Sequence, residues 1–109
     1  MKDFYDVWFL ATRFAFDGQR LSEAVRNTFS RRRTAVPGAY PLALTDEFAN
    51  DGAKTLQWKG FVAKGKLMDR FIDLREVVSR IRDFLGPVLN ALSQGAAFAG
   101  TWHPDGSWQ

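Results

Sequence analysis

The longest regular feature of this 109-residue chain is an apolar stripe with the period of an α-helix, running from residue 74 to residue 92. Apolar side chains recur every three or four residues along it, at Leu74, Val77, Val78, Ile81, Phe84, Leu85, Val88, Leu89 and Leu92. A helix with such a stripe buries it against other elements, so we predict a central helix that begins near Asp73. Pro87 has no N–H for the Asp83 carbonyl, which predicts a kink inside this helix rather than its end.

Shorter helical patterns occupy most of the remaining chain. They predict a helix from Lys2 to Phe16 that stops at Asp17-Gly18 and a second from Leu21 to about Arg33. A short third helix after Thr45 breaks at Asn50-Asp51-Gly52, and a fourth follows to about Lys64 and ends at Gly65. Thr45 is the expected N-cap of the third helix, Tyr40 and Leu42 are expected to pack back from the loop at 34–44, and Glu76 and Arg80 are expected to pair at i,i+4. No segment reads as a strand, and the tail from Gly95 is predicted to be irregular, with a turn at His103–Gly106. The expected fold is all-α: one domain over residues 1–109, a compact bundle of about four to five helices with an irregular C-terminal tail.

Composition narrows the class of protein. The absence of cysteine excludes a disulfide framework and any thiolate metal site. No signal peptide and no apolar run long enough for a membrane span is found, so we expect a cytoplasmic protein without membrane association. A net charge of +3 permits nucleic-acid binding without requiring it.

The first predicted helix, within MKDFYDVWFLATRFAFDG, is apolar on nearly every side. Helices of this kind are normally covered on several faces, which indicates a missing partner: an upstream domain, a second copy or another protein. Self-association through this helix is therefore expected. Asp3 and Asp6 nevertheless project from its first turn, with Lys2 placed to pair with Asp6. Two interpretations stay open, because acids in a first turn favour the helix dipole, while carboxylates and a lysine also suit an Mg²⁺–nucleotide complex.

Two groups of basic residues are candidate nucleic-acid contacts. One is Arg31, Arg32 and Arg33 at the end of the second helix, and the other includes Lys54 and Lys59 on the fourth. Such groups either follow phosphates or form solvated faces. His103, the only histidine, is predicted to be a turn residue, and Trp102 and Trp108 are predicted to cover the edge of the core. No Gly-rich phosphate loop, nucleophile elbow or Cys/His pair is present, so no catalytic nucleophile or base is predicted for the chain alone.

Several stretches together resemble the C-terminal part of the AbiEii/AbiGii-type nucleotidyltransferase toxins, the toxin half of bacterial toxin–antitoxin and phage-defence pairs. They are MKDFYDVWFLATRFAFDG, RRRTAVP, PLALTDEFANDGAKTLQWKGFVAK, VVSRIRDFLGPVLNAL and TWHPDGSW. In that family an R-x-K-D-x-x-D segment supplies one active-site motif. The resemblance thus implies that Asp3, with Lys2 and Asp6, belongs to a site for a nucleoside triphosphate and Mg²⁺, and that an antitoxin is a partner.

The chain departs from the family in one respect. Such toxins carry an upstream G-S-x(10)-D-x-D motif for the catalytic metals, and this sequence has none. The resemblance therefore implies the C-terminal helical part of a longer enzyme, which holds no metal or cofactor alone. Transfer of nucleotides to an acceptor, tRNA ends in some members, is implied for the parent enzyme.

Three functions remain from this reading. The first is a helical domain that contributes its motif to a toxin's active site and is inactive alone. The second is an interaction module that binds an antitoxin, a toxin or itself through Phe4, Trp8, Phe9 and Leu10. The third is a small RNA-binding protein that uses the two basic groups.

Overall fold

The computed structural model describes residues 1–31, 46–67 and 70–109, and in this part of the chain it is predominantly helical. The helices are α1 (Lys2–Arg13), α2 (Gly18–Arg31), α3 (Asp46–Ala49), α4 (Gly52–Gly65) and α5 (Leu74–Ser93). The strands are β1 (Phe16–Asp17), β2 (Thr101–His103) and β3 (Ser107–Trp108). The predicted all-α class is confirmed, with a small sheet added to it.

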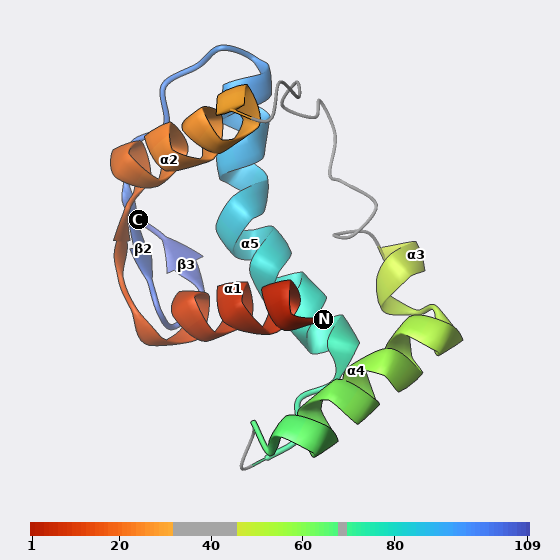
Figure 1. The fold of residues 1–109 in the computed structure, drawn as a ribbon. Coiled ribbons are helices and arrows are strands. Elements are labelled where there is room, and N and C mark those ends of the chain that lie inside the picture. Colours follow the sequence, from red (N-terminus) through yellow and green to blue (C-terminus); the bar gives the residue numbers. More distant parts are fainter. Residues whose placement is uncertain (32–45, 68–69) are drawn as a thin grey trace.

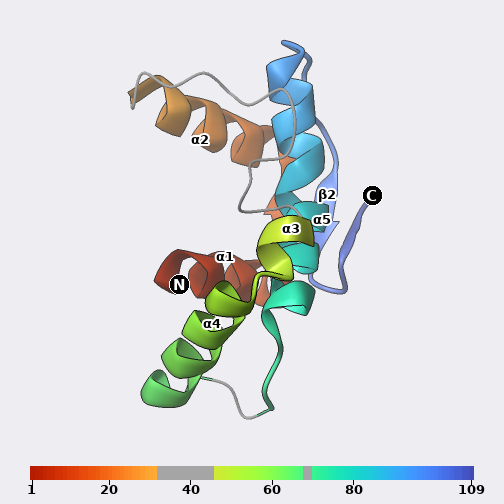
Figure 2. The same cartoon turned by 90° about the vertical axis from the view of Figure 1, so that its right-hand side faces the viewer.

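Helix α5 is the axis of the fold. Both α1 and α2 pack across it, while α3 and α4 contact its N-terminal half (Figure 1). Turned by 90°, the molecule shows α1, α2 and α4 extending to one side of α5 and β2 lying on the other (Figure 2). The apolar stripe that predicted α5 is therefore covered from two directions.

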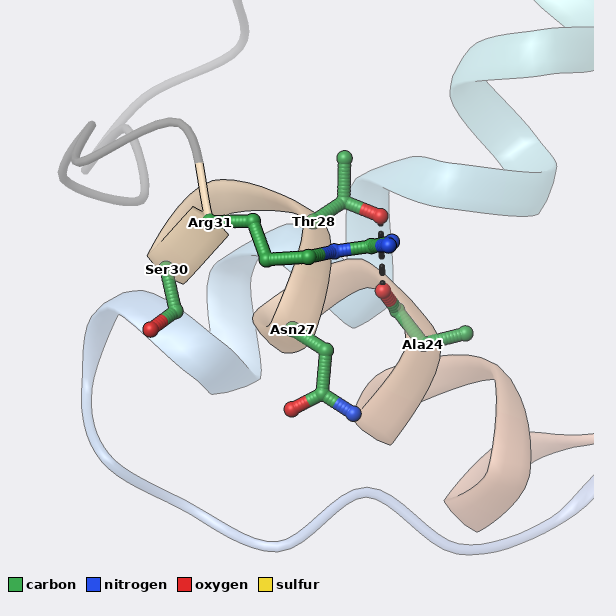
Figure 3. A pocket seen from close by; sticks show the side chains of 5 residues that line it. All are labelled: Ala24, Asn27, Thr28, Ser30 and Arg31. Atoms are coloured by element: carbon green, nitrogen blue, oxygen red, sulfur yellow. Dashed lines mark hydrogen bonds between the residues drawn. The ribbon is translucent and has the colours of Figure 1, made fainter.

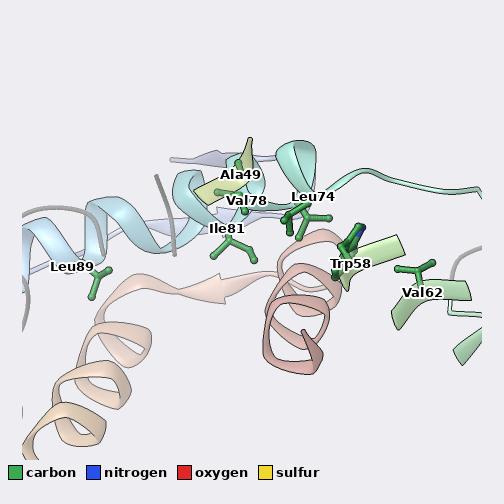
Figure 4. Close-up of a cluster of buried hydrophobic side chains, with 8 residues drawn as sticks. Ala49, Trp58, Val62, Leu74, Val78, Ile81 and Leu89 are labelled. Carbon is green, nitrogen blue, oxygen red and sulfur yellow. The ribbon is translucent and has the colours of Figure 1, made fainter. Parts of the chain in front are cut away.

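Most of the main core lies where α3 and α4 meet the first half of α5, and Leu89 lies farther along α5 (Figure 4). Its buried members are Ala49, Trp58, Val62, Leu74, Val77, Val78, Ile81 and Leu89. Trp58 is fully buried, and its indole Nε1 donates a hydrogen bond of 2.8 Å to the Ile72 carbonyl. The ring thus fills the core while its one polar atom is satisfied, as a buried tryptophan requires.

The sheet corrects the prediction of an irregular tail. Strand β2 pairs antiparallel with β1, placing Trp102 opposite Phe16, and also with β3, placing Trp102 opposite Trp108. The tail is ordered because Trp102 is fully buried against Ala11 and Phe84 in a second apolar cluster. Strands of two or three residues are too short to show the alternating pattern by which a strand is read from sequence.

Two helix boundaries were predicted wrongly. Helix α1 ends at Arg13, because Phe14 already has extended dihedrals of −128° and 151°. Gly18 does not stop the first helix but begins the second. Its N–H donates to the Gly100 carbonyl at 2.7 Å, and a Cβ at this position would lie 3.0 Å from that oxygen. Glycine is needed here for a close approach of two backbone segments rather than for a helix end.

The predictions for the later helices, α4 and α5, are confirmed only in part. Asp51 and Asp73 accept hydrogen bonds from N–H groups of the first turns of α4 and α5. Helix α5 continues through Pro87 as predicted, and the kink stays a prediction. The prediction that Glu76 and Arg80 pair is wrong, because the Arg80 guanidinium instead donates a hydrogen bond to the Asp105 carbonyl at 3.0 Å. The expected Thr45 N-cap and the packing of Tyr40 and Leu42 lie outside the described residues.

Candidate functional site

The first turn of α1 presents the predicted charged pair to solvent. The Lys2 ammonium lies 3.0 Å from an Asp6 carboxylate oxygen, and the two side chains are 79% and 48% exposed. This pairing at i,i+4 is the one that the sequence predicts. Asp3 belongs to the same turn, and its side chain lies outside what the structure describes. An exposed pair of this kind adds little to the stability of the fold.

The opposite side of this turn is fixed by aromatic contacts. The Phe4 ring stacks on Phe48 of α3, with centroids 5.2 Å apart and planes at 16°. Tyr5 donates its hydroxyl hydrogen to the Leu67 carbonyl, 3.2 Å away, just after α4. The charged side chains therefore project from a turn that contacts α3 and the residue after α4.

The same contacts bring a predicted basic residue into the neighbourhood. The Lys54 ammonium lies 5.8 Å from the centroid of the Phe48 ring, which itself stacks on Phe4. Lys54 is thus linked through one ring to the turn that carries Lys2 and Asp6. The sequence offers no signal for this arrangement, since it depends on how α3 packs between α1 and α4.

The other predicted basic residues are not gathered at this site. Arg31 ends α2 and lines a shallow hollow of about 510 Å³ together with Ala24, Asn27, Thr28 and Ser30 (Figure 3). Helices α2 and α4 lie at opposite ends of the molecule, so Arg31 and Lys59 do not form one surface (Figure 1). Arg32 and Arg33 lie outside the described residues.

The described residues alone do not fit an Mg²⁺ site. Divalent cations of this type need several oxygen ligands, and in the first turn Asp6 offers the one described carboxylate, already paired with Lys2. No group of three or more metal-ligating side chains occurs in the described part of the chain. Any Mg²⁺ at this turn therefore needs further oxygen ligands besides the Asp6 carboxylate.

The remaining predicted residues have structural roles. His103 closes β2, and its carbonyl accepts the Gly106 N–H at 3.0 Å, which confirms the predicted turn. Trp108 packs against the edge of the second apolar cluster as predicted, whereas Trp102 is fully buried within it, and its indole Nε1 donates to the Ala11 carbonyl at 2.7 Å. Across residues 1–31, 46–67 and 70–109, no helix is both long and apolar enough to cross a membrane.

The fold and this turn define a small helical protein that presents a lysine–aspartate pair on a fixed helix start. The family model described as "Nucleotidyl transferase AbiEii toxin, Type IV TA system" matches residues 1–85. Because this match covers most of the chain, the chain belongs to that family of nucleotidyltransferase toxins of toxin–antitoxin systems. No curated protein and no solved structure matches the chain. The family match includes α1 to α4 and the first half of α5.

Proposed function

We propose that this chain is the helical C-terminal part of a nucleotidyltransferase toxin and that its first turn completes a nucleotide site. Lys2 is assigned to a phosphate of the bound nucleoside triphosphate, and Asp3 and Asp6 to the Mg²⁺ that accompanies it. The acceptor is an RNA end, such as that of a tRNA, and the cytoplasm is the expected compartment. The observation that carries the proposal is the exposed Lys2–Asp6 pair on a turn anchored by Phe4 and Tyr5.

The chain is proposed to be inactive alone. Phosphoryl transfer depends on metal ions that bridge the phosphates and on groups positioned around them. The described residues supply no such metal cluster, and the 109 residues contain no G-S-x(10)-D-x-D motif. Residues outside this chain, in a longer protein or in a partner, are needed to complete the site.

A transfer assay tests this proposal. The chain is incubated with each α-labelled ribonucleoside triphosphate, Mg²⁺ and total RNA, and label in the RNA is measured. We expect none above the protein-free background. Robust transfer that disappears in Asp3→Ala would refute the claim that the chain is incomplete, because it would show a working active site within these residues.

A second candidate is an interaction module, and the exposed end of α1 favours it in a changed form. Phe4 and Trp8 pack against the main core, so they do not form the expected docking face. Leu10, which belongs to the expected face, is 43% exposed, and the nearby Phe14 is 51% exposed. A protein docked on these two side chains, whether an antitoxin, a toxin or a second copy, would bury them.

Light scattering after size-exclusion chromatography distinguishes a second copy from the other partners. If the exposed side chains drive self-association, the chain elutes as a dimer and Leu10→Asp with Phe14→Asp returns it to a monomer. A monomer at all concentrations, with no change in the variant, excludes self-association through this end of α1.

A further inference from the structure

We propose that a surface around Phe71 binds a short single-stranded stretch of nucleic acid. The Phe71 surface consists of Phe71, Lys59, Lys66 and Arg75, at the side of α4 and the start of α5. A base stacks on the Phe71 ring, and the cations contact the phosphates on either side. This inference does not rest on the proposed nucleotide site, since no residue of α1 lines either hollow described below.

Two hollows meet at Phe71. One has a volume of about 410 Å³ and also takes in Lys59, Asp73 and Arg75. The other, of about 530 Å³, also takes in Lys59 and Lys66. Phe71 and Lys59 line both hollows, so the two spaces adjoin at these two residues. A ligand made of successive similar units, such as a nucleotide strand, fits two adjoining hollows better than one compact molecule does.

The Phe71 ring is accessible for stacking. Phe71 is 45% exposed, although an aromatic side chain of this size is usually among those that folding buries. No ring contact with another described aromatic residue occupies it, in contrast to the rings of Phe4, Phe48 and Phe61. Every base has a π face, so a free ring of this kind binds bases with little regard to sequence.

The charges around the ring are complementary to a phosphate backbone. Lys59, Lys66 and Arg75 are exposed, and none forms an ion pair with a carboxylate in the part of the chain that is described. The one acid that lines the hollows is Asp73, whose carboxylate already accepts the Glu76 N–H at 2.9 Å as the N-cap of α5. The surface is therefore positive overall, and the alternation of cations with an exposed ring favours nucleic acid over an acidic peptide.

Fluorescence anisotropy with a labelled oligouridylate of about eight nucleotides tests the inference on the full 109-residue chain. Phe71→Leu keeps an apolar side chain but removes the stacking face, and we expect about tenfold weaker binding. Leu56→Ala is the control, because Leu56 is 70% exposed on α4, the helix that carries Lys59, and lines neither hollow. Its binding should stay within about twofold of the unaltered chain.

Salt and competitors sharpen the test. Three phosphate contacts predict that log affinity falls with log salt concentration at a slope of about −2. Lys59→Gln should reduce this slope, whereas Arg31→Gln, at the far end of the molecule, should not. Equal binding by Phe71→Leu and the unaltered chain, or equally strong competition by duplex RNA or polyglutamate, would overturn the inference. Circular dichroism of each variant confirms that it is folded.

Discussion

The two ends of α1 are held in opposite ways. At its C-terminal end Ala11 is fully buried, and its carbonyl accepts a hydrogen bond from the buried indole of Trp102. At its N-terminal end Phe4 and Tyr5 contact α3 and the residue after α4, while the paired side chains of Lys2 and Asp6 are exposed to solvent. We infer that the buried contacts of Ala11, Phe84, Trp102 and Trp108, called the aromatic end of α1 below, contribute more to the stability of the fold than the exposed Lys2–Asp6 pair, called the charged end.

The contacts at the C-terminal end of α1 supply hydrogen-bond donors to carbonyls that the helix itself leaves unpaired. The last four carbonyls of an α-helix have no partner within it. In α1 the Leu10 carbonyl accepts the Phe14 N–H, and the Ala11 carbonyl accepts the Trp102 indole. The Phe84 and Trp108 rings then pack around Trp102, with centroids 5.0 and 5.5 Å from it. One side chain from the tail therefore closes both the helix end and the second apolar cluster.

Trp102→Ala gives the largest expected effect. It leaves a cavity and removes the partner of a buried carbonyl, and together these should lower the free energy of unfolding by about 3–5 kcal/mol. Urea unfolding followed by circular dichroism measures this loss. Phe14→Ala is the control at the same end of α1, because its side chain is 51% exposed. If both variants lose equal stability, the aromatic end does not secure the fold.

Gly106→Ala comes next, because it disturbs the turn that connects the two tail strands. Gly106 has a φ of +110°, and a Cβ there would overlap the Arg80 guanidinium. We expect a loss of about 1–3 kcal/mol in the free energy of unfolding. Gly60→Ala in α4 is the matched control, since no atom lies within 4 Å of its added Cβ. That variant should gain up to about 1 kcal/mol from helix propensity. A free energy of unfolding that is unchanged or higher in Gly106→Ala would show that the turn is not constrained.

Trp108→Phe isolates one hydrogen bond of the aromatic end. The Trp108 indole Nε1 donates to the Phe84 carbonyl at 3.1 Å, while its ring stacks on Phe84. Phenylalanine keeps most of the stacking and loses the donor, so we expect a loss of about 1 kcal/mol. Thermal unfolding measures it. An effect as large as that of Trp102→Ala would mean that Trp108, rather than Trp102, is the principal support.

Lys2→Ala gives the smallest effect, at the charged end. Exposed i,i+4 pairs are worth only a few tenths of a kcal/mol, so the free energy of unfolding should change by less than about 0.5 kcal/mol. The same urea titration measures it beside Trp102→Ala. A loss above about 2 kcal/mol would make the first turn a structural element and would remove the contrast between the two ends.

The helices were predictable from sequence because their signals are local. The stripe from Leu74 to Leu92 repeats with the period of the helix that it forms, and Asp51 and Asp73 mark helix starts by residue type and spacing. The sheet was not predictable, because β1 and β2 lie at opposite ends of the chain and pair over only two residues each. The predicted Glu76–Arg80 ion pair is wrong for a similar reason, because the Arg80 guanidinium donates a hydrogen bond to the carbonyl of Asp105, which is distant in sequence.

The candidate site likewise has features that the sequence predicts and features that depend on how the helices pack. The Lys2–Asp6 pair was predictable because both residues belong to adjacent turns of one helix. The link from Lys54 through Phe48 to Phe4 depends on the packing of three helices, and spacing along the chain does not reveal it. The Phe71 surface was missed because its hollows exist only where α4 meets the segment before α5. Lys59 was recognised as basic, but its aromatic neighbour was not.

The most direct test of the charged end is nucleotide transfer by the gene product read from the native locus, including any open frame that continues upstream of the Met1 codon. Lys2→Ala and Asp6→Asn are compared with Leu56→Ala, using labelled nucleoside triphosphates, Mg²⁺ and RNA. The account predicts about a hundredfold loss of transfer in the first two variants, unchanged stability in both, and full activity in the third. Full transfer by Asp6→Asn and Lys2→Ala would contradict it.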